Sequence, residues 1–205
     1  MISVGLLLSA SLALASGGAE PPLSPEAAKV VNILDALKAN ERRPSSAAGA
    51  GAEQTFEVSE GEINAYLAYR IAREPKGVRS ATVRLREGKL IEVELVASLD
   101  PQLLDSLDAQ ALGWVRRVLL PLTRAENRIR VVGFFTSARG KGFYQTRSVE
   151  LNGHAVPDSW VEEAMDLIGP RIKPPLDFHR LFDLSHGVEK GEVLPGRVRL
   201  RVRGP

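Results

Sequence analysis

The pattern of hydrophobic and polar positions predicts helices separated by pairs of strands. In the first three helical segments, apolar residues recur every three or four positions, and the third segment is the longest. A fourth, short segment is followed by Gly169-Pro170, which stops it. The predicted helices cover residues 24–40, 59–71, 100–122 and 158–168.

Alternation of apolar and polar residues predicts a first hairpin after the second helix. It joins residues 78–86 to 91–97 through a turn at 87–89, with a slip in phase near Ser80. One face of this hairpin is therefore apolar. On the other face Arg84 and Arg86 lie opposite Glu92 and Glu94, so we expect cross-strand ion pairs on an ordinary solvated surface.

A second hairpin and a final strand pair follow the long helix. The hairpin joins 128–138 to 143–151 through a Gly-rich tip at 139–142, and the last strand runs through 197–203. The tip joins two strands and opens no helix, which argues against a phosphate-binding loop.

The second helix has a clear start signal. Ser59 and Glu62 have the spacing of a capping box, in which each side chain bonds the other residue's backbone N–H. Ile63 and Leu67 then share its apolar face. Asn64 also lies on this helix, and the sequence identifies no partner for it.

Composition divides the chain into three parts. Residues 1–19 carry no charge and include Ala13-Leu14-Ala15, so we expect a cleaved signal peptide and a periplasmic or secreted protein. The alternative is an uncleaved N-terminal membrane anchor, although about 14 apolar residues are short for a ~30 Å hydrocarbon core. Residues 20–54 form a helix and a flexible linker rich in small residues, and 55–205 form the main domain.

Several kinds of chemistry are disfavoured. The chain has no cysteine, so disulfides and thiolate metal sites are excluded. The 27 Lys+Arg balance 25 Asp+Glu, which gives no reason to expect nucleic acid as a partner. No serine lies in a nucleophile elbow. Asp177, His179, Asp183 and His186 match no metal-ligand spacing. We expect no enzyme activity, no metal and no cofactor.

Four arginines alternate along the last strand and so share one face. One interpretation is a solvated edge strand protected by its charge. The other is a contact with anionic lipid headgroups, worth about 1 kcal/mol per residue near such a membrane. These residues, here called the arginine ladder, are Arg197, Arg199, Arg201 and Arg203.

Three stretches resemble bacterial envelope proteins of the tubular lipid-binding (TULIP-like) superfamily, and the likeness spans residues 56–203. The first is 58–67, from Val58 to Leu67. The second is the Gly-Lys-Gly tip followed by 148–153 and Val156-Pro157. The third runs from 187–189 through 194–198.

The resemblance implies an α+β fold in which a curved antiparallel β-sheet wraps around one or two long amphipathic helices. It further implies an apolar groove between sheet and helices that binds or shuttles a lipid or another apolar small molecule, with no catalytic residues. The residues expected to line this groove are Ile63, Leu67, Val83, Leu85, Val93, Leu95, Leu104, Leu107 and Val115.

Two other functions stay open at this point. A structural or assembly module of the envelope would have the same pattern with its interior filled by its own side chains. A hydrolase with an unrecognised site is a more distant alternative.

Overall fold

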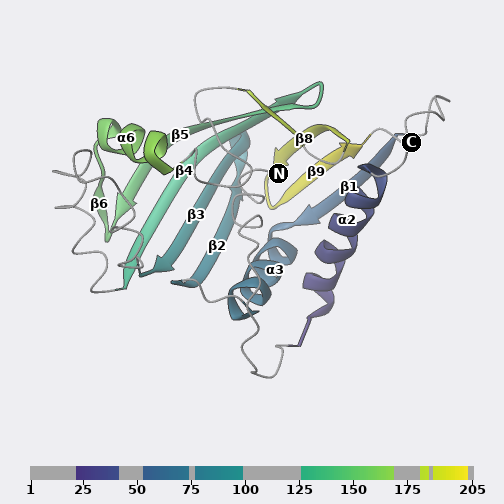
Figure 1. Ribbon diagram of the computed structural model, residues 1–205, viewed down its shortest axis with the longest axis horizontal. Coiled ribbons are helices and arrows are strands. Elements are labelled where there is room, and N and C mark those ends of the chain that lie inside the picture. The colour runs from purple at the N-terminus through teal and green to yellow at the C-terminus, as the bar shows by residue number, and fades with distance from the viewer. Residues whose placement is uncertain are drawn as a thin grey trace.

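The chain folds into an α+β structure built on two antiparallel sheets, which confirms the predicted class (Figure 1). In this computed structural model the described residues are 22–41, 53–73, 77–98, 126–168, 181–184 and 187–202. One sheet has six strands and is called the large sheet; the other has three and is called the small sheet. The resemblance led us to expect a single curved sheet, so the division into two is a difference from the prediction.

The large sheet contains both predicted hairpins side by side, in the order β2-β3-β4-β5-β6, with β7 paired to β5. A register shift between Val78 and Ser80 confirms the predicted slip in phase. The second hairpin turns at Arg139 and Gly140 alone, because pairing extends to Ala138 and Lys141, so its tip is shorter than predicted. The strands are β2 (Val78–Arg86), β3 (Leu90–Ala97), β4 (Asn127–Ala138), β5 (Lys141–Leu151), β6 (His154–Ala155) and β7 (Phe182–Asp183). A 3-10 turn, η1 (Glu87–Lys89), joins β2 to β3.

The small sheet joins residues 54–59 to the C-terminal end of the described chain. β1 (Gln54–Ser59) and β8 (Val188–Leu194) are its outer strands, and β9 (Arg197–Val202) lies between them. The interpretation of the arginine strand as an edge strand is therefore wrong. Pairing with β1, more than 130 residues away in sequence, makes β9 the central strand.

The predicted starts of the three described helices agree with the structure. The helix α2 (Pro25–Glu41) begins after Ser24, whose Oγ accepts a hydrogen bond from Ala27 N at 3.2 Å. The helix α3 (Glu60–Arg73) has both bonds of the predicted capping box, Ser59 N to Glu62 Oε2 at 2.7 Å and Glu62 N to Ser59 Oγ at 3.2 Å. The helix α6 (Asp158–Ile168) has the predicted bounds.

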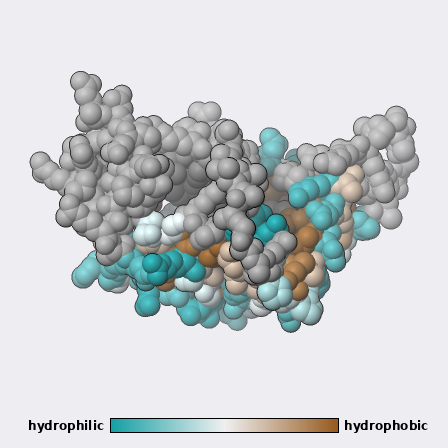
Figure 2. Space-filling model, turned by 60° about the horizontal axis from the view of Figure 1, so that its bottom comes forward, coloured by the Kyte–Doolittle hydropathy of each residue, from teal (hydrophilic) through white to brown (hydrophobic). Residues whose placement is uncertain are grey.

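One core connects α2, α3 and the two sheets. The helices α2 and α3 lie next to each other, and α3 also packs against β2 (Figure 1). On the other side, β8 packs against β4, and Gly191 of β8 lies against Phe135. Hydrophobic residues appear in the middle of the described surface in Figure 2, and hydrophilic residues lie along its lower edge.

Some predictions concern residues outside those described. These are the signal peptide at 1–19, linker residues 42–52, the long helix at 100–122 with Leu104, Leu107 and Val115, and Arg203. Within the described part of the chain, no helix is long and apolar enough to cross a membrane.

Candidate functional site

Two apolar rows cross four strands of the large sheet. One row consists of Ala81, Leu95, Ile129 and Leu151, which lie opposite one another in successive strand pairs. Residues directly opposite in antiparallel strands point to the same face, so each row forms a continuous apolar surface. The parallel row consists of Val83, Val93, Val131 and Val149. We call these eight residues the apolar strip.

Burial decreases along the apolar strip from β2 to β5. Val83 is 0% exposed and Val93 is 8% exposed, and both belong to the core that includes Ile63 and Leu67 of α3. Further from α3 the apolar strip is partly exposed. The partly exposed residues are Leu95 on β3, Ile129 and Val131 on β4, and Val149 and Leu151 on β5. The apolar face of the sheet is therefore wider than the area that α3 buries.

The predicted lining residues divide between core and apolar strip. Ile63, Leu67 and Leu85 are at most 3% exposed and lie in the core. Val83, Val93 and Leu95 belong to the apolar strip, and of these Leu95 is partly exposed. The strip residues of β4 and β5 were not predicted as lining residues from the sequence, although the alternation in the second hairpin marks them as apolar. The missed residues are Ile129, Val131, Val149 and Leu151.

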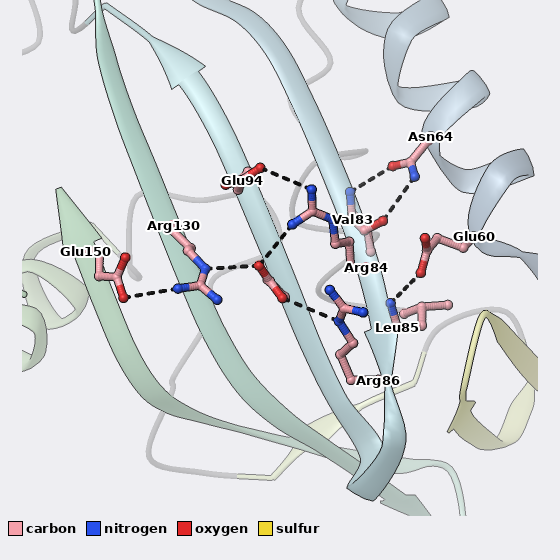
Figure 3. A network of polar contacts seen from close by, with 10 residues as sticks. Glu60, Asn64, Val83, Arg84, Leu85, Arg86, Glu94, Arg130 and Glu150 are labelled. Atoms are coloured by element: carbon pink, nitrogen blue, oxygen red, sulfur yellow. Dashed lines mark hydrogen bonds and ion pairs between the residues drawn. The ribbon is translucent and has the colours of Figure 1, made fainter. Parts of the chain in front are cut away.

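The opposite face of the large sheet carries an ion-pair network centred on Glu92. Three arginines contact its carboxylate: Arg130 at 2.9 Å, Arg84 at 3.3 Å and Arg86 at 3.5 Å. Figure 3 shows Arg84 on β2, Arg130 on β4 and Glu150 on β5 in a line across the sheet, with Glu150 3.1 Å from Arg130. The predicted pairs of this hairpin are thus present. We call this cluster, with Glu94, the Glu92 network.

Glu92 is not the solvated side chain that the sequence suggested, because its side chain is 9% exposed. Burial raises the pKa of Glu92, but the hydrogen bond from Arg130 and the charges of Arg130, Arg84 and Arg86 outweigh that effect. The pKa of Glu92 therefore lies below its usual 4.5. The carboxylate is ionised at neutral pH, where it neutralises the arginines around it.

The side chain of Asn64 binds the free edge of β2 as a neighbouring strand would. Its Nδ2 donates to Val83 O at 3.0 Å, and its Oδ1 accepts from Val83 N at 2.7 Å (Figure 3). One helical turn earlier, Glu60 Oε2 accepts from Leu85 N at 2.7 Å. The β8–β9 turn completes this edge, since Gly196 N donates to Leu85 O at 3.0 Å. These bonds prevent β2 from pairing with another strand.

Carboxylates partner the described residues of the arginine ladder. Glu57 of β1 lies 2.7 Å from Arg199 and 3.6 Å from Arg197, and Arg201 lies 3.7 Å from Glu53. The hydrogen bond from Arg199 is the main cause of a lowered pKa of Glu57. The ladder is therefore part of a mixed-charge face rather than an isolated cationic surface.

No group of three or more potential metal ligands occurs among the described residues. Asp177, His179 and His186 lie outside those residues. Ser59, the serine nearest to several carboxylates in sequence, has its hydroxyl occupied as a helix cap.

Comparison with protein-family models, curated proteins and solved structures finds no significant match to this chain.

Proposed function

We propose that this protein binds a lipid or another apolar ligand on the apolar strip of its large sheet. The observation that supports the proposal is the partial exposure of the strip on β3, β4 and β5, beyond the area that α3 buries. Each buried methylene group of an acyl chain contributes about 0.8 kcal/mol, so a surface several side chains long can bind a lipid tail. The protein then acts by desolvation and not by catalysis.

The proposal includes the finer features implied by the TULIP-like resemblance. These are export to the bacterial envelope, as a periplasmic, secreted or N-terminally anchored protein, and a curved sheet that wraps around long amphipathic helices. The proposal also includes contact with an anionic membrane through the arginine ladder, although this contact is expected to be weak. Among the described residues of that face, four cations (Arg197, Arg199, Arg201 and Lys190) stand against three carboxylates, so they contribute an attraction of about one net charge. The carboxylates are Glu53, Glu57 and Glu192.

A second function, that of a structural or assembly module without a ligand, is supported by a different observation. Five of the six predicted lining residues that are described are at most 8% exposed, and they belong to one core cluster. Native interiors of this kind are close-packed and leave no space for a ligand. The two functions differ in whether the exposed part of the apolar strip accepts an apolar molecule.

A test uses the full chain, native mass spectrometry and the fluorescent fatty acid cis-parinaric acid. Lipid binding predicts co-purified phospholipid and saturable fluorescence enhancement, which the double variant Val131→Thr/Val149→Thr weakens at least fivefold. Val132→Thr is the matched control, because Val132 lies opposite Ser148 on the other face of β4. Absence of both lipid and saturable enhancement from folded protein would favour the structural module.

A further inference from the structure

One edge of β1 has no strand partner among the described residues. The other edge pairs with β9. Ser59 N donates to Glu62 at 2.7 Å and so points away from β9. Because the direction of the peptide groups repeats every second residue, the N–H and C=O groups of Glu57 and Thr55 point to the same open edge. The backbone hydrogen bonds of the described residues outside regular elements include none to these groups.

Two comparable edges are closed by other parts of the chain. Asn64 and Glu60 bind the edge of β2, as described above. At β8, Ser137 Oγ donates to Gly191 O and accepts from Gly191 N, each at 2.7 Å, and Gly140 N donates to Glu189 O at 2.8 Å. A strand edge with unpaired backbone groups is a template for another chain, so the open edge of β1 is a candidate binding site.

A groove of about 670 Å³ lies along this open edge, between β1 and α2. Figure 1 shows α2 running beside β1. Neighbouring strands lie about 4.8 Å apart, so a strand added to the open edge of β1 would lie within this groove, between β1 and α2. Apolar atoms predominate on the walls of the groove, which include Ala28, Ile33 and Phe56.

The charges at the groove are already neutralised within the chain. Lys29 on the helix side lies 2.7 Å from Glu62, and Glu57 on the strand side lies 2.7 Å from Arg199. An incoming charged side chain therefore finds no free counterion at these positions. The matching ligand has an extended backbone and uncharged side chains.

From these observations we propose that β1 binds an extended, uncharged peptide segment of a partner protein, which adds as a strand between β1 and α2. Backbone hydrogen bonds provide affinity in this mode, and side-chain pockets provide selectivity. The site lies on the small sheet, so this proposal does not depend on lipid binding by the large sheet.

The test uses a capped, fluorescein-labelled heptapeptide of alternating threonine and valine, measured by fluorescence anisotropy with the full chain. Two further peptides carry N-methyl groups on alternate residues, so that each loses the donors of one edge. We expect one of these to lose at least tenfold in affinity and the other to stay within threefold. Equal binding of both, or no binding of the unmethylated peptide, would overturn the proposal.

Variants of Thr55 locate the binding site. Thr55→Pro removes an N–H from the open edge and is compatible with an edge strand, whereas Thr55→Val keeps the N–H. We expect at least a tenfold loss of peptide affinity for Thr55→Pro and less than twofold for Thr55→Val, with circular dichroism confirming that both variants are folded. Amide exchange at Glu57 should slow when the peptide is added to the unmodified protein.

Two other occupants of the groove between β1 and α2 are distinguishable by experiment, and evidence for either would overturn the proposal. Sedimentation that finds a dimer for the unmodified protein and a monomer for Thr55→Pro would assign the edge to a second copy of the chain. Displacement of the peptide by cis-parinaric acid from the unmodified protein, at concentrations that saturate its fluorescence, would assign the groove to an acyl chain.

Discussion

The side-chain amide of Asn64 pairs with the backbone of Val83 at both its donor and its acceptor, at 3.0 and 2.7 Å. The residues are 19 positions apart, on a helix and on the outermost strand of the large sheet. This pairing fixes α3 against the sheet edge and so positions Ile63 and Leu67 over the start of the apolar strip. Asn64 thereby links the helix packing to the candidate ligand surface.

Replacing Asn64 by alanine should destabilise the protein by about 1–3 kcal/mol, because it leaves a partly buried N–H and C=O of Val83 without partners. Urea unfolding followed by circular dichroism measures this change. Asn32→Ala is the matched control, since Asn32 is exposed on α2, and its effect should be under about 0.5 kcal/mol. Equal effects of the two variants would contradict the role assigned to Asn64.

Replacing Glu92 by glutamine should cost about 1.5–3 kcal/mol, because the arginines around it lose a charged hydrogen-bond acceptor. Glu94→Gln provides the comparison on the same strand. Its contact with Arg84 is longer, at 3.8 Å, and its side chain is 35% exposed, so a loss of less than about 1 kcal/mol is expected. A larger loss for Glu94→Gln than for Glu92→Gln would show that the network is not centred on Glu92.

The lowered pKa of Glu92 also predicts how stability depends on pH. A carboxyl group whose pKa is lower in the folded protein stabilises it above the unfolded pKa, near 4.5, and this contribution is lost as the pH falls through the folded value. The free energy of unfolding should therefore fall as the pH is lowered below about 5. Other carboxyl groups with lowered pKa, such as Glu62, add to this fall. The fall should be smaller in Glu92→Gln, and an identical pH profile for the two proteins would argue against the pKa effect.

Gly133 should not tolerate a side chain. A Cβ at this position would meet the ring and hydroxyl of buried Tyr144 and lie 2.7 Å from Gln145 O. Gly133→Ala should therefore lower stability by about 1–3 kcal/mol through overpacking, measured by urea unfolding.

Gly61→Ala is the matched control, and it should raise stability where Gly133→Ala lowers it. Gly61 lies on the exposed surface of α3, where an added Cβ would have no other atom within 4 Å, and alanine favours helix. The substitution should raise stability by up to about 1 kcal/mol. A stable Gly133→Ala protein would mean that both the Tyr144 side chain and the backbone at Gln145 can move away from Gly133.

Local elements of this protein follow from its sequence. The capping box at Ser59, the start of the first helix at Ser24, the bounds of α6 and the irregularity near Ser80 were all predicted and are present. Each depends on residues close in sequence, whose side chains can reach the backbone groups they satisfy. The ion pairs of the first hairpin were predicted for the same reason, because a short turn fixes which residues face each other.

Tertiary structure decided the features that join distant segments. Pairing of β9 with β1 turned an expected edge strand into a central one and placed Glu57 against the arginine ladder. Arg130, 38 residues from Glu92, and Asn64, 19 residues from Val83, were not assigned these partners from the sequence. Alternation identifies which residues of a strand are apolar, but it does not identify the neighbouring strand or the helix that covers it. The sequence alone therefore determined the faces of the individual strands and helices, and the packing of α3 decided which part of the apolar strip is buried.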